Sequence, residues 1–403
     1  MTTSIDLYQL RRRPVMSGRA LTDAAAERFQ SFTNRAEVVR AAPFTGITTD
    51  GTPQPGLFSL HRTGIATAPI ADAAEAFLRS LTDQQRDGAM FGIDDPAWMQ
   101  WFNVHPFVMR HGAVLEEMNT AQREAALGIL AATLSASGYE TARNVIRLNE
   151  TIGEMTESWE EYGEWLYWMS VFGTPSADQP WGWQIDGHHL NVNCFVLGEQ
   201  IVMTPTFMGS EPVEAPSGKY AGTRVFADEE RLGLELIRAL TPQQQDKAIL
   251  FRSVISTDLP QGRFRGPDGR IQGGAFQDNA RVAYEGLHCD ELSPPQQSLL
   301  LDLVETYTGR MQPGHAEVKL AEVKRHLGET HLAWMGGTDE DSVFYYRIHS
   351  PVLLIEFDHE SGVAFDNAEP TRTHVHTVVR TPNGNDYGKD LLRRHRKQFH
   401  REP

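Results

Sequence analysis

The sequence predicts an α+β protein, with helices around a modest antiparallel sheet in a single large domain. Between Ile70 and Trp165, apolar residues recur three and four positions apart, which is the period of an amphipathic helix. Two later regions, Phe172 to Phe207 and Val343 to Arg380, hold short apolar or alternating runs that are typical of strands. The 403 residues, 40% of them hydrophobic, are enough to bury one large core.

The first 70 residues are expected to form an N-terminal arm and a hairpin. Residues 1–20 are basic and irregular, Thr22 to Arg35 has a helical pattern, and Phe44 to Ile65 is rich in Thr, Gly and Pro. That last composition is typical of a short hairpin or a loop. Residues 71–400 are expected to form one continuous core of helices and sheet, and no internal repeat is evident.

Helix caps and apolar runs place the later elements. Thr241 before Pro242, and Ser293 before two prolines, are residue types that begin helices. Helices are therefore predicted at Asp228–Leu240, Pro242–Leu250, Ser293–Arg310 and His315–Leu327, and from about Tyr387. Strands are predicted at His188–Leu197, Ile201–Phe207, Val343–Ile348, Val352–Asp358 and His374–Arg380.

Composition excludes several classes of partner. A net charge of −16 argues against nucleic acid or an anionic membrane as the main partner, so a small-molecule substrate is expected. No apolar run reaches the length of a membrane span. Two cysteines do not make a disulfide framework, and no secretory segment precedes the fold. These features predict a cytoplasmic protein, and they leave its oligomeric state open.

Two histidine groups, Gly187-His188-His189 and His374-Val375-His376, lie in or beside predicted strands. Imidazole is the commonest protein ligand for transition metals, and a strand presents residues i and i+2 on one face. Along the strand His188–Leu197, the apolar residues share a face with His188, whereas Asn191 and Asn193 share a face with His189. Alternation therefore favours His189 as the inward histidine, with His188 as a cap or an additional ligand.

Glu356 lies inside the nearly continuous apolar run Val352–Asp358. A buried carboxylate needs a cation, a metal or a proton, so Glu356 is a candidate metal ligand or general base. A structural salt bridge from Glu356 to Arg380 is the alternative.

Further polar and aromatic residues are weaker candidates. His331 could be an extra ligand or base, and Arg380 could act in catalysis. Asn191, Asn193 and Trp183 could line a substrate pocket, with core packing as the alternative for the tryptophan. Arg110 could bind a substrate carboxylate or form a salt bridge at a helix end.

From about Trp101 to His395 the chain resembles the bacterial and fungal proteins of the uncharacterised domain family DUF3500. The similar stretches are Trp181-Gly182-Trp183-Gln184-Ile185-Asp186-Gly187-His188-His189, Thr204-Pro205-Thr206-Phe207-Met208-Gly209, Gln277-Asp278-Asn279, Tyr284-Glu285-Gly286, Leu354-Ile355-Glu356-Phe357-Asp358, His374-Val375-His376 with Arg380, and Asp386-Tyr387-Gly388-Lys389-Asp390-Leu391-Leu392 with His395. The chain departs from the resemblance over Asp366 to Thr373. The family name carries no chemistry, so function rests on the site.

Three functions are compatible with these residues. The first is a metal-dependent hydrolase, in which a water activated by a divalent ion attacks a small molecule. The expected ligand set is His188, His189, His374, His376 and Glu356, and the expected ion is Zn²⁺, with Fe, Mn or Cu as alternatives. The second is a non-haem metal oxidoreductase on two histidines and a carboxylate. The third is a non-catalytic binding protein whose histidines are hydrogen-bonded to Glu356, Asp358 and Arg380.

Overall fold

The computed structural model describes residues 30, 33–34, 36–38, 41–104, 110–159, 161–265, 268–365 and 367–399. The arm predicted over residues 1–20, and most of the helix predicted over Thr22 to Arg35, lie outside the described residues. Phe44 to Ile65, predicted as a short hairpin or a loop, is a loop that makes one bridge, from Thr48 to Arg281. Its glycines and prolines interrupt any ladder of hydrogen bonds.

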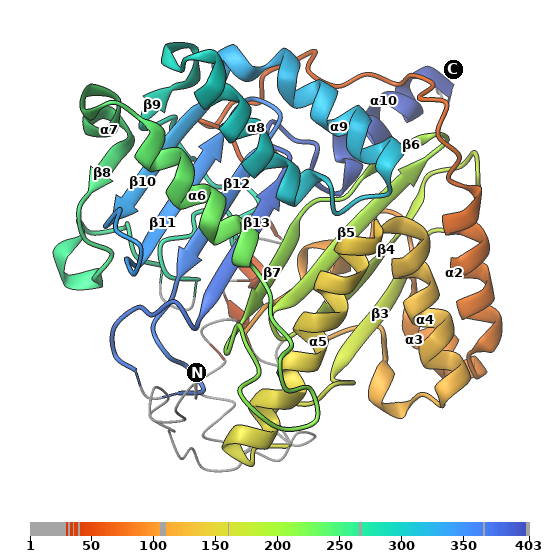
Figure 1. The fold of residues 1–403 in the computed structure, drawn as a ribbon. Helices are drawn as coiled ribbons and strands as arrows, with labels where there is room; N and C mark the ends of the chain where they lie inside the picture. Colours follow the sequence, from red (N-terminus) through yellow and green to blue (C-terminus); the bar gives the residue numbers. More distant parts are fainter. Residues whose placement is uncertain are drawn as a thin grey trace.

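The chain alternates helical pairs with groups of strands, and Figure 1 follows it from red to blue. The elements of the first half are α2 (Ala68–Ser80), α3 (Asp83–Ala89), β1 (Met90–Phe91), β2 (Ala113–Val114), α4 (Thr120–Thr133), α5 (Ala136–Thr156), β3 (Tyr167–Phe172), β4 (Trp181–Gly187), β5 (Leu190–Leu197), β6 (Gln200–Val202) and β7 (Thr206–Ser210).

The second half repeats this alternation and ends in one further helix. Its elements are α6 (Ala227–Ala239), α7 (Pro242–Ala248), β8 (Ile249–Phe251), β9 (Leu287–His288), α8 (Pro294–Thr308), α9 (Pro313–Arg325), β10 (His331–Gly336), β11 (Phe344–His349), β12 (Leu354–His359), β13 (Val375–Arg380) and α10 (Lys389–Phe399). The four helices predicted between Asp228 and Leu327 are confirmed.

The strands of the described residues form one mixed sheet of 13 strands, in the order β1-β3-β4-β5-β7-β13-β12-β11-β10-β8, with β2, β6 and β9 beside this path. The α+β class is confirmed, but the sheet is larger than expected. It is also mixed, because β1 pairs in parallel with β3, and β8 with β10. These edge strands have two or three residues, which is too short to show a period in the sequence.

The two halves share one order of helices and strands, apart from β6 and α10, so the structure contains a repeat that was not evident in the sequence. From one edge to the centre the strands are β1, β3, β4, β5 and β7, and from the other edge they are β8, β10, β11, β12 and β13, which is the same order within each half. At the centre β7 and β13 pair antiparallel. The register also repeats: Gln184 of β4 pairs with Asn193 of β5, and Arg347 of β11 pairs with Glu356 of β12 in the same place. We call the β7–β13 pair the seam.

Helix caps repeat together with the strands. Capping boxes begin α3, α4, α7 and α8, at Thr82, Asn119, Thr241 and Ser293. In each half a hydrogen bond joins the two capping boxes. Gln122 of α4 donates to Gln85 of α3, and Gln296 of α8 donates to Gln244 of α7. The helical layers also meet symmetrically, since the amide of Ser135 donates to Arg310 while the amide of Gln312 donates to Thr133.

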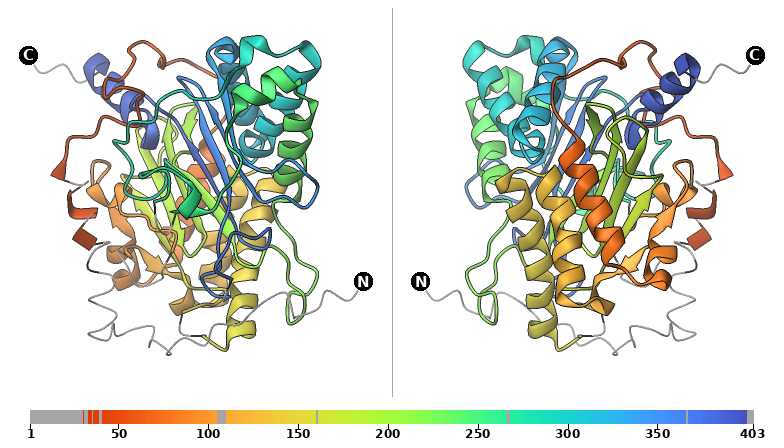
Figure 2. Two further views of the ribbon diagram at one scale, coloured as in Figure 1. Left: turned by 90° about the vertical axis from the view of Figure 1, so that its left-hand side faces the viewer. Right: turned by 90° about the vertical axis from the view of Figure 1, so that its right-hand side faces the viewer.

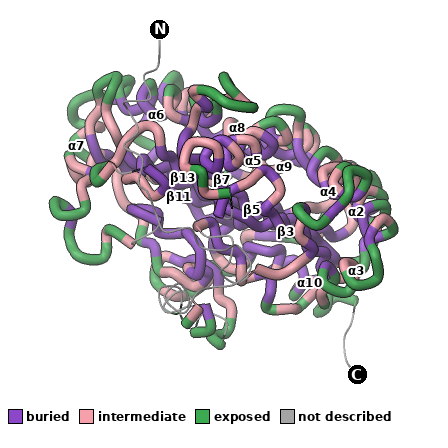
Figure 3. The backbone as a smooth tube through the Cα atoms, turned by 90° about the horizontal axis from the view of Figure 1, so that it is seen from below, coloured by how far each residue is buried: buried purple, intermediate pink, exposed green. Residues whose placement is uncertain are grey.

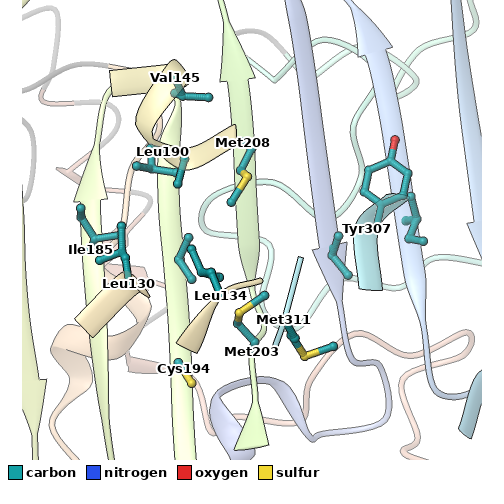
Figure 4. Packing of buried hydrophobic residues seen from close by; sticks show 14 of the residues in the cluster. Leu130, Leu134, Val145, Ile185, Leu190, Cys194, Met203, Met208, Tyr307 and Met311 are labelled. Atoms are coloured by element: carbon teal, nitrogen blue, oxygen red, sulfur yellow. The ribbon is translucent and has the colours of Figure 1, made fainter. Parts of the chain in front are cut away.

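The sheet separates two apolar layers. The long helices α2, α4, α5, α6, α8 and α9 cover one face (Figure 1), whereas α10 lies on the other side (Figure 2). Figure 4 shows Leu190 and Met208 of the strands packed against helical residues such as Leu130 on the helix-covered face. The opposite face carries a second cluster, to which Phe207 and Val378 of the seam belong. The centre of the sheet is therefore buried on both sides (Figure 3).

Among the described residues, no helix is long and apolar enough to cross a membrane.

A glycine with positive φ precedes each of the equivalent strands β2 and β9: Gly112 (φ 98°) and Gly286 (φ 89°). A Cβ at Gly286 would lie 2.1 Å from the carbonyl oxygen of Leu332, whereas Gly56, also with positive φ (84°), has no atom within 4 Å of such a Cβ. Gly56→Ala should therefore cost only the backbone term of about 1–2 kcal/mol. Gly286→Ala should cost about 1–3 kcal/mol more. Urea unfolding measures both, and equal losses would contradict the close approach.

Candidate metal centre

The hairpin between β4 and β5 turns on two histidines. Gly187 pairs with Leu190, which leaves His188 and His189 as the turn residues. His189 has φ 61°, a left-handed conformation that side chains with a Cβ rarely adopt and that glycine or asparagine usually fills. Such a conformation persists only where the surroundings impose it, and it concentrates at functional sites.

The backbone of His189 is held on both sides. Its amide donates to the carbonyl of Asn103 at 2.9 Å, and its carbonyl accepts from the amide of Gly209 on β7 at 2.8 Å. Its ring stacks on His188, with the ring centroids 3.9 Å apart. These contacts fix the imidazole beside the seam, where β13 is the next strand.

Three histidine rings meet there. His376 of β13 pairs with Gly209 of β7, and His374 immediately precedes β13. The Nε2 atom of His376 lies 3.0 Å from that of His374 and 3.2 Å from that of His189. All three side chains are buried, and their ligand atoms lie within 4.8 Å of one another. The predicted proximity of His189 to the His374/His376 pair is confirmed, and its role in binding metal stays a prediction.

Gly209 provides the space for two of these rings. A Cβ at this position would lie 2.9 Å from Cδ2 of His376, 3.3 Å from Cδ2 of His189 and 2.7 Å from the carbonyl oxygen of Val375. A side chain here would push the rings apart. The glycine therefore belongs to the site although it carries no functional group.

Hydrogen bonds alone cannot satisfy the three Nε2 atoms. Nδ1 of His374 lies 2.7 Å from the carbonyl of Ser361, so it carries the hydrogen and Nε2 has the lone pair. Nε2 of His376 contacts both other Nε2 atoms, yet one ring nitrogen offers a single hydrogen or a single lone pair. One of its two contacts is left unsatisfied in any arrangement of neutral rings. A cation that accepts all three lone pairs removes the conflict.

The spacing also suits a metal. Ligand nitrogens 2.0–2.1 Å from a tetrahedral zinc ion stand about 3.3 Å apart. The measured separations of 3.0 and 3.2 Å are close to this value.

Two carboxylates stand behind the rings, on the Nδ1 side. Glu211 lies 3.7 Å from Nδ1 of His374, and Glu360 lies 3.8 Å from Nδ1 of His376. Glu211 accepts backbone amides from Val363, Ala364 and Phe365. By contrast, Oε1 of Glu360 and Nδ1 of His376 are both buried with no hydrogen-bond partner among the described residues. Metal-bound histidines usually donate their second N–H to such a carboxylate.

The surroundings hold more buried acids than cations. Arg270 pairs with Asp358 and lies 3.5 Å from Glu360, so a single guanidinium faces both carboxylates. Asp268 is a third acid close by, since it contributes to the field at Glu360. Burial and the charge of Asp358 raise the pKa of Glu360 well above its usual range. A divalent cation at the three histidines would reduce this excess of negative charge.

Burial, followed by the neighbouring histidines, holds the pKa values of His189 and His376 well below their usual range. Both rings are therefore neutral at pH 7, with a lone pair available on each.

The inward histidine is His189, as expected, although the reason differs. Alternation along a strand does not apply, because His189 lies in the turn before β5 begins. His188 points elsewhere: its Nδ1 contacts Oδ1 of Asn149 at 2.8 Å, and its ring lies beside Tyr162. The expectation of His188 as a ligand is therefore not supported by its contacts.

Glu356 lies outside the histidine group, which corrects its expected role as metal ligand or base. Its carboxylate accepts the amides of Gln272 and Gly273 and the hydroxyl of Tyr345, and its register partner is Arg347. Burial raises its pKa. The alternative salt bridge is also wrong, because Arg380 pairs with Asp278 at 2.6 Å and with Asp386 at 2.8 Å. Arg380 therefore holds loops to the sheet and has no place at the centre.

The other expected site residues have structural contacts. His331 begins β10, separated from β13 by β11 and β12, and stacks on Tyr284. Arg110 forms a buried salt bridge with Asp186 of β4 at 2.5 Å, whereas the alternative had placed its salt bridge at a helix end.

The expected pocket residues behave in the same way. Asn191 donates to Asp186, Asn193 donates to the carbonyl of Pro205, and Trp183 packs in the core under the helices. All three lie in the interior of the fold, and Asn191 is on the same face of the sheet as the histidine group, because it pairs with Phe207, whose ring contacts His376.

Sequence reasoning missed Gly209, Glu211 and Glu360. Glu211 follows β7 directly and Glu360 follows β12 directly, so both leave strands that flank β13. A carboxylate at the end of a strand next to a His-x-His strand was the available signal.

The comparisons with known proteins identify a family. No curated protein and no solved structure matches the chain. A family model described as a protein of unknown function, DUF3500, matches residues 63–389, which include all three histidines of the centre. The chain therefore belongs to the DUF3500 family.

Proposed function

We propose that this protein is a metal-dependent enzyme that acts on a small molecule, with one divalent ion held by His189, His374 and His376. The observation that carries the proposal is the convergence of three buried Nε2 atoms which hydrogen bonds cannot satisfy together. Three neutral imidazoles with a fourth position open to water are a ligand set of catalytic zinc.

Hydrolysis is the reaction that this ligand set favours. A zinc ion lowers the pKa of its bound water toward neutrality and so supplies a hydroxide nucleophile at pH 7. The residues of the chain would orient the ligands: Ser361 accepts from His374, and Glu360 faces His376. Glu356 has no part in this proposal, because its carboxylate is engaged by backbone amides.

A redox enzyme is the second candidate. The expected ligand set of two histidines and one carboxylate is excluded, because Glu356 lies outside the histidine group. Three imidazoles, however, also suit iron or copper. Elemental analysis of protein purified without chelator separates the candidates: zinc favours the hydrolase, whereas iron or copper favours the redox enzyme. If the purified protein holds no metal and takes up no added Zn²⁺, Fe²⁺, Mn²⁺ or Cu²⁺, the proposal is wrong, and the non-catalytic binding protein becomes the favoured function.

Replacing His189 by asparagine separates function from stability. Asparagine tolerates the left-handed conformation, so His189→Asn should abolish metal binding while the metal-free protein unfolds at the same free energy or up to about 1 kcal/mol higher. Metal content by mass spectrometry and urea unfolding measure the two effects. His331→Asn, the same change on β10, three strands from β13, should keep the metal. Full metal content in His189→Asn would exclude this histidine as a ligand.

Glu360→Gln tests the carboxylate behind His376. The amide has the same shape but brings no negative charge to face Nδ1 of His376 at 3.8 Å, so metal affinity should fall by about 10–100-fold. Competition with a chromogenic chelator gives the affinity, and the exposed Glu369→Gln is the control. Unchanged affinity in Glu360→Gln would show that the 3.8 Å approach has no role in metal binding.

Gly209→Ala tests the space between the rings. Because the new methyl would displace His376 or His189, metal affinity should drop by at least about 10-fold. Gly128→Ala on α4 is the matched control, since a Cβ there meets no atom within 4 Å. The idea fails if both variants bind metal as tightly as the wild type.

A further inference from the structure

A second site lies at the seam, on the face of the sheet that the helices cover. A cavity of about 370 Å³ opens between α9, the ends of β7 and β13, and the extended segment 57–63. Volumes of this size are typical of sites for small molecules. Figure 4 labels three residues that line this cavity, Met203, Met311 and Tyr307 of α8.

The cavity and the histidine centre lie on opposite faces of the sheet. Thr206 and Val379 line the cavity, whereas their neighbours Phe207 and Val378 belong to the cluster on the other face. His376 shares the face of Phe207, since the two rings are in edge contact at 5.0 Å. Successive residues of a strand point to opposite sides, so the two sites are separate.

Apolar side chains contribute to the wall from six different parts of the chain: Phe58, Met203, Met311, Leu353, Val379 and Leu391. Such a lining favours a ligand with an apolar body over a sugar or a nucleotide.

Two polar side chains in this wall carry nitrogen atoms without a hydrogen-bond partner among the described residues. His315 is 5% exposed and lines the cavity, and its ring has no hydrogen-bond partner among the described residues. Arg310 is 3% exposed, and its Nε is likewise without a partner there, although its terminal nitrogen bonds to Glu229. Buried polar groups are normally satisfied, so unpartnered ones that line a cavity indicate a ligand that supplies acceptors.

The charge of the lining indicates the class of ligand. Arg62, Arg310, Lys319 and Arg325 line the cavity, whereas Glu322 is its one carboxylate. Arg62 pairs with Glu199, Arg310 with Glu229 and Lys319 with Glu322, so Arg325 is the cation of the lining that has no carboxylate partner among the described residues. This cation favours an anionic group on the ligand.

We propose that this cavity binds an apolar carboxylic acid of medium chain length, with the carboxylate at His315 and Arg310 and the chain against the apolar wall. The proposal is independent of the metal centre, because no residue is shared.

Calorimetry on the full chain with octanoate tests the proposal, with octan-1-ol as the control for the tail and acetate as the control for the head. Octanoate should bind one site at least about 10-fold more tightly than either control. His315→Gln should weaken octanoate at least about 5-fold, whereas His326→Gln, at the end of the same helix and outside the cavity, should leave the affinity unchanged. Metal content should be unaffected throughout.

Filling the cavity locates the binding. Val379→Trp should abolish octanoate binding, and Val318→Phe on α9 is a second filling variant for the case that the first does not fold. Octanoate that binds no more tightly than octan-1-ol, or binding that survives a folded filling variant, would overturn the proposal. So would failure of octanoate to bind the wild type.

Discussion

The pairing of β7 with β13 is the contact on which the rest of the structure depends. It joins the two repeated units into a single sheet, from Val375 opposite Ser210 to Val379 opposite Thr206. The same ladder places His376 opposite Gly209, where only a glycine leaves room for the two rings. Because alternate residues point to opposite faces, it also separates the polar centre on one side from the cavity on the other.

Much of the fold could be predicted from the sequence, because periodicity is local. The helices from Ala227 to Arg325 were predicted within a few residues, since caps and apolar spacing mark them. The extent of the sheet was missed because its edge strands are too short to show a pattern. The repeat was missed because the matching residues are confined to short stretches: Leu81-Thr82, Gln84-Gln85, Asp87 and Ala89 return as Leu240-Thr241, Gln243-Gln244, Asp246 and Ala248.

The candidate site was likewise predicted only in part. The three histidines could be brought together in prediction because two of them form a His-x-His pair and the third precedes a stripe of amides. The error over Glu356 has a physical cause: a buried carboxylate needs compensation, but the amides of Gln272 and Gly273 supply it from a distant loop. Nothing local in the sequence distinguishes a backbone amide from a metal as the partner. Glu211 and Glu360 depend on the same long-range geometry.

The three histidines come from both structural units, one from the first and two from the second. An ion bound to all of them would act as a cross-link that the unfolded chain lacks, so ligation and global folding would be thermodynamically linked. At a free metal concentration 1,000 times the dissociation constant, this linkage adds about 4 kcal/mol to the free energy of unfolding. Metal supply would then set the fraction of the protein in which the two units are folded together.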